Sequence, residues 1–513
     1  MKLSEMFESH MVLQQGMPVP IWGEAADGDV VQVCVAGKYA CAVAQNGRFR
    51  ATLPALPVGG PYVLTASCGK ESILLQDVYV GEVWLAGGQS NMEMPLMCAS
   101  GAQSYLDAEH FPVLRLKVVS RRSYPCNRQF SFHFLPESSD PQPWRKAERK
   151  NAALFSAIGH VFGDEIAKSM DVPVGIISCN WGGTKVQPWV SPQTLASSDV
   201  FSGDSDAFKH LRCKLGDLAK SSQAAFKRSV SMIKMSTEEI ICSSLENPFY
   251  YWKLDGTLPW PPDGAVGDPN EPACLFTYML SRVFPFAMRG VLWYQGESSA
   301  VVEDVFRYEE EMRAMIGDWR QAFENDRLIF LLTQLAPYDT DRRAAPCDWM
   351  QIRDQQRRLA NTCPGVYLGC IPDLGDACNI HPTRKIEAGE RMALLALECV
   401  YAKIPCGQGP VALFTIETSG GIVVCFSHAQ GLRCESQPFI ELSPDGKVFE
   451  AADEISLLPS ALLCMSRIVP APRFIRYAWR PLMDTAIQNG HGLPAGPFFL
   501  PILDSTGQAR ERT

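Results

Sequence analysis

Alternating apolar and polar positions predict half-buried β-strands in the first part of the chain. Residues 31–35 read Val-Gln-Val-Cys-Val, with an apolar side chain at every second position, which is the period of a strand with one buried face. Asn46-Gly47 lies between two strand-like segments and is a typical two-residue hairpin turn. We therefore expect residues 1–76 to form an N-terminal β-sandwich domain.

From about residue 77 the pattern changes to apolar runs that alternate with segments of helical spacing. Short apolar runs predict buried strands, and apolar positions three or four residues apart predict helices. The expected strands cover residues 78–85, 113–119, 174–178, 290–294, 328–333 and 366–371, and the expected helices cover residues 152–169, 302–324 and 347–361. Strands and helices that alternate with short connections form a parallel sheet flanked by helices. The fold class is therefore α/β.

Residues 200–275 interrupt this pattern and predict an insertion. A polar helical segment at about 205–239 precedes a loop rich in proline and aromatic residues, at 247–262. Long loops of this kind are often functional. Exposed aromatic rings would stack on a sugar, whereas buried rings would only hold the insertion in place, and we favour the structural role.

Beyond the α/β region the chain returns to strand patterns. Strands are expected at 411–416, 422–426 and 473–479, and residues 443–446 (Ser-Pro-Asp-Gly) predict a turn. We therefore expect a C-terminal β-sandwich. The patterns together predict three domains, which cover residues 1–76, 77–408 and 409–513.

One stretch, residues 80–94, joins a buried strand to a candidate nucleophile. Apolar residues lead into Gly87-Gly88, and Gln89-Ser90 follow at once. Glycine tolerates backbone angles that other residues avoid, so a strand that ends in this way can present a serine hydroxyl above the sheet. That is the geometry of a nucleophilic serine. The alternative is a glycine-rich turn in which Ser90 is only a cap.

Three further strand ends carry polar or reactive groups. Gly182-Gly183 follow the third expected strand, Gln295 and Glu297 follow the fourth, and His381 follows the sixth. Ligands of open α/β sheets bind beyond the carboxyl ends of the strands. We therefore predict one site to which these residues and Ser90 contribute. The alternative for Gln295 and Glu297 is a buried polar pair that ties two strands together.

Composition narrows the class of protein. The formal net charge is −9 and no run of Lys or Arg occurs, which argues against a nucleic-acid partner. No apolar run approaches the ~20 residues of a membrane span, so we expect no membrane partner. The first eight residues lack the apolar core of a signal peptide, so we expect a cytoplasmic protein. The oligomeric state is left open.

The 18 cysteines are scattered and none forms a C-x-x-C pair. Zinc and dithiol sites depend on such spacings, so we expect no metal and no cofactor. We expect reduced thiols, many of which fill the core, such as Cys34, Cys179, Cys370 and Cys425.

Four ordered motifs resemble those of one enzyme family. They are residues 88–92 (Gly-Gln-Ser-Asn-Met), 180–184 (Asn-Trp-Gly-Gly-Thr), 293–298 (Trp-Tyr-Gln-Gly-Glu-Ser) and 380–382 (Ile-His-Pro). This set resembles the sialate O-acetylesterases of the SGNH-hydrolase superfamily, and the likeness extends to residues near both ends of the chain. The resemblance implies an SGNH-hydrolase-like parallel sheet. Other carbohydrate acetylesterases share the serine and Gln-Gly-Glu motifs, so the resemblance specifies the reaction more closely than the substrate.

The chemistry of acyl transfer agrees with the resemblance. This reaction needs a nucleophile, a base and donors for the oxyanion. Ser90 would attack the acetyl carbonyl, and His381 would take its proton. The oxyanion donors would be the backbone N–H of Ser90, a backbone N–H of Gly182 or Gly183, and the side-chain amide of Gln295.

The carboxylate that orients the predicted histidine base has several candidates. Many SGNH hydrolases carry Asp three residues before the histidine, where this chain has Cys378. Glu297 resembles the glutamate that assists the histidine in some related acetylesterases, and it is our preferred candidate. Asp376 and Asp373 are the alternatives, as is a Ser–His dyad with no carboxylate.

Three functional hypotheses follow. The first is a serine esterase that hydrolyses O-acetyl esters of sialic acids, with a small O-acetylated sugar as its substrate. The second is an acetylesterase that acts on another acetylated glycan, such as acetylxylan. The third is a non-catalytic carbohydrate-binding protein on the same fold, which the lack of Asp at position 378 favours.

Overall fold

The computed structural model describes residues 1–108, 113–121, 142–203, 269–302, 305–343, 346–483 and 486–503. The chain divides into two compact units. The first unit comprises Met1–Gln295 and Glu310–Phe330, and the second comprises Gly296–Glu309 and Leu331–Thr513. The helical segment predicted at 205–239 and the aromatic loop predicted at 247–262 lie outside the described residues.

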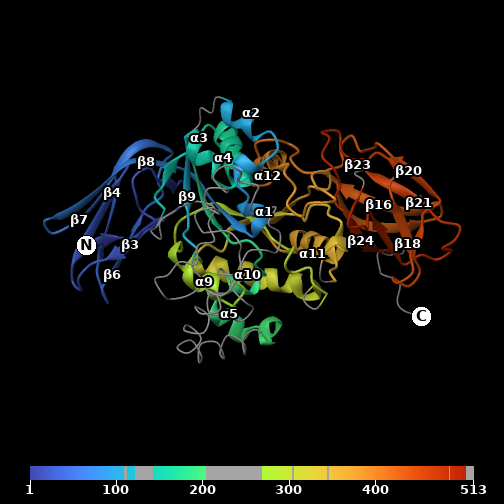
Figure 1. Ribbon diagram of the computed structural model, residues 1–513, viewed down its shortest axis with the longest axis horizontal. Helices are drawn as coiled ribbons and strands as arrows, with labels where there is room; N and C mark the ends of the chain where they lie inside the picture. The colour runs from blue at the N-terminus through green and yellow to red at the C-terminus, as the bar shows by residue number, and fades with distance from the viewer. Residues whose placement is uncertain are drawn as a thin grey trace, which may run out of the picture. The chain divides into compact units, whose positions relative to one another are not determined.

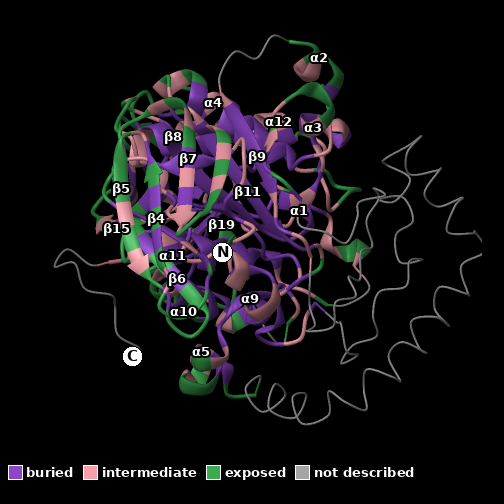
Figure 2. Cartoon of the chain, turned by 90° about the vertical axis from the view of Figure 1, so that its left-hand side faces the viewer, coloured by how far each residue is buried: buried purple, intermediate pink, exposed green. Residues whose placement is uncertain are grey.

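The N-terminal region of the first unit consists of two β-sheets, as predicted (Figure 1). One sheet has the order β1 (Lys2–Leu3), β3 (Val19–Glu24), β6 (Arg48–Leu53). The other joins β5 (Lys38–Val43), β4 (Val30–Val35), β7 (Gly59–Cys68) and β8 (Glu71–Gly88). In β4 every second side chain is buried, whereas β5 is largely exposed (Figure 2).

The predicted hairpin turn joins β5 to β6. Asn46 and Gly47 both have positive φ, at 54° and 74°, which is the geometry of a type I′ turn. The flanking Gln45 and Arg48 exchange two backbone hydrogen bonds, at 2.8 and 3.1 Å. The local sequence therefore determines this turn.

The strand β8 is 18 residues long and belongs to both the N-terminal region and the central sheet. Its first part pairs with β7, and its last part pairs in parallel with β11 (Val174–Asn180) and β12 (Gly290–Tyr294). The predicted boundary between residues 76 and 77 thus falls inside a continuous strand. A short strand, β2 (Val12–Gln14), also pairs in parallel with β8.

In the first unit the central sheet has the order β10 (Arg145–Lys146), β9 (Leu114–Val118), β11, β8, β12. The strand β11 is buried along its whole length (Figure 2), and so is β12, as expected for parallel strands covered on both faces. The expected α/β class is confirmed. The sheet is mixed rather than wholly parallel, because β10 runs antiparallel to β9.

One face of this sheet is covered by α4 (Ala157–Met170). A Cβ added to Gly159 would lie 3.2 Å from the Cβ of Ala86 on β8, and one added to Gly163 would lie 2.8 Å from Ile176 on β11. The two glycines, one helical turn apart, therefore let the helix approach the strands closely. The ring of Phe162 packs edge-on against Trp84 at 5.1 Å.

The opposite face of the sheet holds a cluster of three tryptophans. Trp293 pairs with Gly87, and side chains alternate along a strand, so Trp293 and Trp84 lie on opposite faces. The ring of Trp293 makes edge contacts with Trp189 at 5.9 Å and with Trp319 at 5.5 Å. Trp293 and Trp181 are 1% and 4% exposed, so both are core residues.

The remaining helices of the first unit are short. They are α1 (Ser90–Glu93), η1 (Leu96–Cys98), α2 (Ala102–Asp107), α3 (Arg149–Ala153), η2 (Gln187–Trp189), α5 (Pro192–Ser197), η3 (Asp199–Phe201), α9 (Cys274–Tyr278) and η4 (Leu280–Arg282). The longer helix expected at 302–324 begins later than predicted: α10 covers Tyr308–Ala322 and enters the first unit at Glu310, and a 3₁₀ turn of the second unit, η5 (Val305–Arg307), precedes it.

The second unit contains the last α/β elements. They are β13 (Ile329–Thr333), which enters this unit at Leu331, η6 (Thr340–Arg342), α11 (Trp349–Thr362), β14 (Val366–Gly369) and α12 (Lys385–Cys399). A Cβ added to Gly369 would lie 2.4 Å from the sulfur of Met392. The helix α12 therefore packs closely on the end of β14.

The rest of the second unit is the predicted C-terminal β region. One sheet has the order β15 (Val411–Thr418), β16 (Gly421–Ser427), β21 (Ala461–Met465), β20 (Glu454–Leu458), and another has the order β19 (Glu450–Ala451), β18 (Ile440–Ser443), β22 (Phe474–Tyr477), β24 (Phe498–Pro501). Two further short strands, β17 (Arg433–Cys434) and β23 (Ile487–Gln488), pair with each other in a separate two-stranded sheet. Both four-stranded sheets contribute to one core, for example Val424 and Ile475, each 0% exposed.

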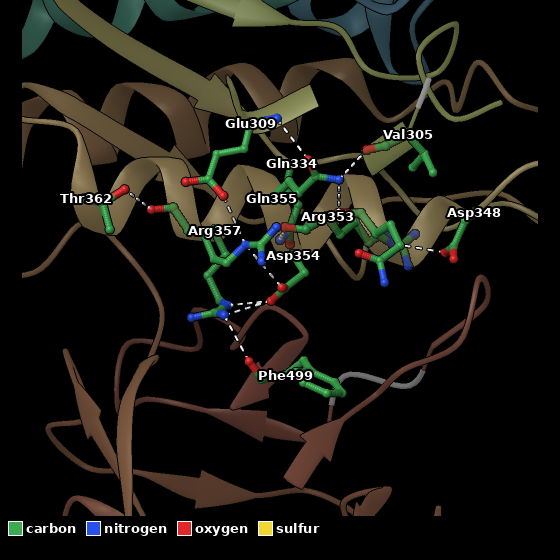
Figure 3. A network of polar contacts seen from close by, with 12 residues as sticks. Val305, Glu309, Gln334, Asp348, Arg353, Asp354, Gln355, Arg357, Thr362 and Phe499 are labelled. Atoms are coloured by element: carbon green, nitrogen blue, oxygen red, sulfur yellow. Dashed lines mark hydrogen bonds and ion pairs between the residues drawn. The ribbon is translucent and has the colours of Figure 1, made fainter. Parts of the chain in front are cut away.

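Polar side chains of α11 tie this β region to the helix (Figure 3). Arg353 is 0% exposed, and its guanidinium donates to the carbonyl oxygens of Leu335, Arg480 and Pro481 at 2.9–3.1 Å. One turn later, Arg357 pairs with Asp354 and donates to the carbonyl of Phe499 on β24. Because these donors are satisfied by fixed backbone groups, breaking them would leave a buried charge without compensation.

The expectation that Cys34 fills the core is wrong. Cys34 is exposed, because it occupies the outward-facing register of β4, between the buried Val33 and Val35. Cys179 is buried as expected, whereas Cys370 and Cys425 are half-buried.

The end of β8 approaches the end of β12 so closely at Gly88 that we expect a side chain there to lower the free energy of unfolding. Gly88 has φ +123°, and a Cβ there would lie 2.1 Å from the carbonyl oxygen of Tyr294. Gly88→Ala should combine backbone strain with overpacking and lower the free energy of unfolding by about 3–5 kcal/mol. The matched control is Gly47→Ala, which also has positive φ but open space around it and should cost about 1–2 kcal/mol. Urea unfolding of both variants measures the difference, and equal losses would contradict the argument.

Candidate active site

Three strands of the first unit end at the same level. Gly88 pairs with Asn180 at the end of β11 and with Tyr294 at the end of β12. Past these pairs, the Trp181 N–H donates to the Gly88 carbonyl at 3.1 Å, and the Gln89 N–H donates to the Tyr294 carbonyl at 3.0 Å. The residues that follow the three strands are Ser90, Gly182 and Gln295, so the register of the sheet places them at one edge.

Ser90 begins α1 directly after the glycine-broken end of β8. It is 9% exposed. The helix is held by Ser156, whose hydroxyl donates to the Met92 carbonyl at 2.6 Å and accepts from the Gly159 N–H at 3.1 Å. The backbone around Ser90 is therefore fixed from both β8 and α4.

The Gly182-Gly183 turn lies against Ser90. A Cβ added to Gly182 would lie 3.3 Å from the Cβ of Ser90, so no side chain fits there without displacement. The Gly182 N–H donates to Glu93 Oε2 at 2.7 Å. Gly183 has φ +71°, and its carbonyl accepts from Asn270 Nδ2 at 3.0 Å. Within the described part of the chain, no group accepts from the Gly183 N–H.

The carboxylate of Glu93 has a second partner. Its Oε1 pairs with the Arg121 guanidinium at 2.6 Å, and both side chains are largely buried, at 16% and 13% exposed. The Arg121 Nε–H also donates to the Asn180 carbonyl at 3.3 Å, and the guanidinium lies over the ring of Trp181. An ion pair therefore borders the turn beside Ser90.

Gln295 is the last residue of the first of the two segments that make up the first unit. It is 0% exposed, and its Nε2 donates to the Thr184 carbonyl at 3.2 Å. Gln295 thus ties the end of β12 to the turn that follows β11.

Glu297 and His381 belong to the second unit. Glu297 is 2% exposed, and it follows Gly296, which has φ +144° and packs against Ile352 and Leu335. His381 is half-buried, and its backbone N–H donates to Asn379 Oδ1 at 2.9 Å. Contacts within the second unit therefore hold the backbone next to Glu297 and at His381.

The two alternative carboxylates hold the loop before His381. Asp376 Oδ1 accepts from the backbone N–H groups of Cys378 and Asn379, at 2.8 and 3.2 Å. Asp373 makes a bidentate ion pair with Arg391. Both side chains stabilise the loop conformation, which is a structural use of the carboxylates.

A buried lysine lies in the first turn of α12, four residues after His381. Lys385 is 1% exposed. Burial lowers the pKa of Lys385 to about 7, while the negative charge of Glu297 opposes this shift. Burial of the ring, together with the positive charge of Lys385, lowers the pKa of His381 to about 3. His381 is therefore neutral at physiological pH.

Sequence reasoning missed Glu93, Arg121 and Lys385. Glu93 stands three residues after Ser90 in the same helix, and Lys385 stands four residues after His381 at the start of α12, so each charge is close in sequence to a predicted catalytic group. That spacing was the available signal for these two residues. Arg121 has no such signal, because only the sheet brings it to Glu93.

The described residues hold no group of three or more His, Cys, Asp or Glu side chains arranged to bind a metal ion. In the same part of the chain, no helix combines the length and apolar character needed to cross a membrane.

Comparison with known proteins gives consistent results. Residues 271–397 match the model of a carbohydrate esterase family described as sialic acid-specific acetylesterase. The chain is 25% identical to the sialate O-acetylesterase of Mus musculus, over 80% of this chain and 75% of that protein. It is 23% identical to the Homo sapiens sialate O-acetylesterase, over 78% of this chain and 71% of that protein.

A solved structure agrees over almost the whole chain. The crystal structure of a carbohydrate acetylesterase from Xanthomonas citri has a TM-score of 0.74 and 26% sequence identity, and the match covers 97% of this chain and 99% of that one. Fold and similarities together define a carboxylic ester hydrolase. The chain is a relative of the sialate O-acetylesterases, so the resemblance inferred from the four motifs is confirmed.

The charge of Lys385 makes a prediction for His381. Lys385→Met removes a positive charge that lowers the pKa of His381, so that pKa should rise. It should stay below the ordinary value of about 6.5, because burial, the larger cause, remains. NMR titration of the imidazole C–H signal, assigned with His381→Gln, measures the shift. The exposed Lys403→Met is the control and should leave the signal unchanged; an unchanged or lowered pKa in Lys385→Met would contradict the coupling.

Proposed function

We propose that this protein is a serine acetylesterase that hydrolyses O-acetyl esters of sialic acids, with Ser90 as nucleophile and His381 as base. The observation that carries the proposal is the common level of three strand ends, which gathers Ser90, the Gly182-Gly183 turn and Gln295. A nucleophile beside fixed N–H donors is the arrangement that acyl transfer requires. The SGNH-like assignment of these roles rests on the sequence motifs.

Neutral His381 accepts the Ser90 hydroxyl proton as the serine oxygen attacks the acetyl carbonyl. The tetrahedral intermediate then expels the sugar oxygen, which takes the proton from His381, and leaves an acetyl-enzyme. A water molecule attacks this ester with His381 again as base, which releases acetate and restores Ser90. The lowered pKa of His381 keeps the free imidazole neutral at physiological pH, but it also weakens the affinity for the serine proton, so the role requires a group that stabilises the imidazolium.

The negative charge of each tetrahedral intermediate needs preorganised donors. We assign this role to the backbone N–H of Ser90, a backbone N–H of the Gly182-Gly183 turn and the side-chain amide of Gln295. A single donor of this kind is worth about 3–4 kcal/mol in comparable acyl-transfer sites. The bond from Gln295 to the Thr184 carbonyl supports the assignment, since it fixes the amide before substrate arrives.

Glu297 is our candidate for the carboxylate that orients His381. Asp376 and Asp373 are already bound to backbone N–H groups and to Arg391. The electrostatic influence of Glu297 on Lys385, which in turn acts on His381, supports its presence in the same charged cluster of the second unit. A carboxylate in this role stabilises the imidazolium that forms as the proton moves.

The substrate is proposed from the relatives. The matched family model and the mammalian relatives are described by sialic acid, which supports O-acetylated sialic acid. The Xanthomonas citri structure, described only as a carbohydrate acetylesterase, supports a second candidate, another acetylated glycan such as acetylxylan. Initial rates on O-acetylated sialic acid and on acetylated xylan decide between them.

The nucleophile is tested first. Ser90→Ala removes the attacking oxygen and should lower the turnover of O-acetylated sialic acid and of 4-nitrophenyl acetate by at least about 1,000-fold. Circular dichroism should not change, because the fold around Ser90 is held by backbone bonds. Ser104→Ala, an exposed position of α2, is the control and should keep wild-type rates. Retained turnover in Ser90→Ala would exclude the mechanism.

The orienting carboxylate is tested by three isosteric variants. Glu297→Gln should lower kcat by about tenfold or more and change KM little, because the interaction strengthens toward the transition state. Asp376→Asn and Asp373→Asn should mainly lower the free energy of unfolding, by about 1–2 kcal/mol each, since both carboxylates hold the loop. Kinetics and thermal unfolding of all three separate the roles. A crippled kcat in Asp376→Asn would instead favour the local carboxylate, and no effect in any variant would favour a dyad.

A further inference from the structure

Glu93 occupies one of the two glycine N–H groups that the proposed mechanism offers to the oxyanion. Its Oε2 accepts from Gly182 at 2.7 Å, a length typical of a strong bond to an ionised acceptor. The same side chain pairs with Arg121 at 2.6 Å through its other oxygen. A tetrahedral oxyanion at the Gly182 N–H would have to displace a carboxylate that is already bound on both sides.

The next N–H group along the turn, that of Gly183, is fixed in position although no group in the described part of the chain accepts a hydrogen bond from it. The Gly182 N–H is anchored by Glu93, and the Gly183 carbonyl is anchored by Asn270 at 3.0 Å. The peptide group between them, which carries the Gly183 N–H, is therefore fixed from both sides. No group in the described part of the chain accepts from this N–H.

The packing around the turn makes its position depend on Glu93. A Cβ at Gly182 would lie 3.2 Å from Glu93 Oε2 and 3.3 Å from the Cβ of Ser90, so the turn fills the space between the carboxylate and the nucleophile. Glu93 is also the last residue of the helix that Ser90 begins. One short helix thus carries the nucleophile at one end and the anchor of the neighbouring turn at the other.

The carboxylate of Glu93, if uncompensated, would repel the developing oxyanion and raise the activation barrier of acyl transfer. The Arg121 guanidinium compensates for this charge through the ion pair with Glu93, and it is held by the Asn180 carbonyl at the end of β11. The pair is largely buried, and removing one member of such a pair leaves the other charge uncompensated. Arg121 and Glu93 are therefore expected to act as a unit.

We propose that Glu93 is a positioning residue that anchors the Gly182 N–H so that the Gly183 N–H is the backbone donor of the turn, with Arg121 neutralising the charge of Glu93. This inference rests on the proposed serine mechanism and narrows its two candidate glycines to one. Glu93 does not touch the reacting atoms and acts through the turn.

Glu93→Ala tests the inference. It removes the acceptor and should lower kcat by about 10- to 100-fold, less than the roughly 100- to 1,000-fold loss seen when an oxyanion donor is removed outright, because the Gly183 N–H is displaced and not deleted; KM should change by less than about threefold. Glu93→Gln keeps an oxygen for the Gly182 N–H and should recover a large part of the lost kcat. Glu165→Ala, a partly exposed carboxylate of α4, is the control. Thermal unfolding confirms that the compared variants are folded.

A transition-state analogue separates positioning from general damage. A trifluoromethyl ketone that mimics the acetyl group forms a tetrahedral oxyanion adduct with a serine, so its inhibition constant should rise in Glu93→Ala by the same factor as kcat/KM falls. If Gly182 were itself the donor and Glu93 a competitor for it, Glu93→Ala would keep or raise kcat, and the inference would be overturned. That result with an inactive Ser90→Ala would leave the serine mechanism standing, whereas an active Ser90→Ala would remove the mechanism.

Discussion

The hydrogen-bonded register at the end of β8 is the constraint on which the candidate site depends. Gly88 pairs with Asn180 on one side and Tyr294 on the other, and only glycine fits beside the Tyr294 carbonyl. A shift of one residue in either neighbouring strand would move its loop by about 3.3 Å along the strand direction. The nucleophile, the glycine turn and the glutamine amide therefore depend on strand pairing before any side chain contributes.

Two buried charged side chains in the described part of the chain are held by fixed partners. Glu93 is held by a backbone N–H and by Arg121, and Arg353 donates to three backbone carbonyls while fully buried. Lys385 is different, because its burial lowers its pKa to about 7 despite the charge of Glu297. Perturbed groups of this kind concentrate at functional sites, and Lys385 stands four residues after the predicted base, at the start of α12. The cost of burying charge thus points to the segment around the His381 motif in the second unit.

Local pattern by itself determined the elements and much of the chemistry. Each strand expected in the α/β region is present, because an apolar run of strand length that is bounded by turn signals is too short to form a buried helix. The Asn46-Gly47 turn is also set locally, since both residues tolerate positive φ. The four motifs predicted an esterase, and the similarities to known acetylesterases agree. These features depend on neighbours in the sequence, which is why the sequence reveals them.

Features that depend on which face or which partner a residue meets were decided only by the tertiary structure. Cys34 is apolar enough for a core, but the register of β4 turns it outward. The predicted boundary at residue 76 falls inside β8, because one continuous strand pairs with both the N-terminal and the central strands. The partner of Glu93 lies 89 positions away in the chain, and Arg121 reaches it only because β9 and β11 are adjacent. Contacts between segments that are distant in the chain produce no periodic pattern in the sequence, so they can be identified only from the tertiary structure.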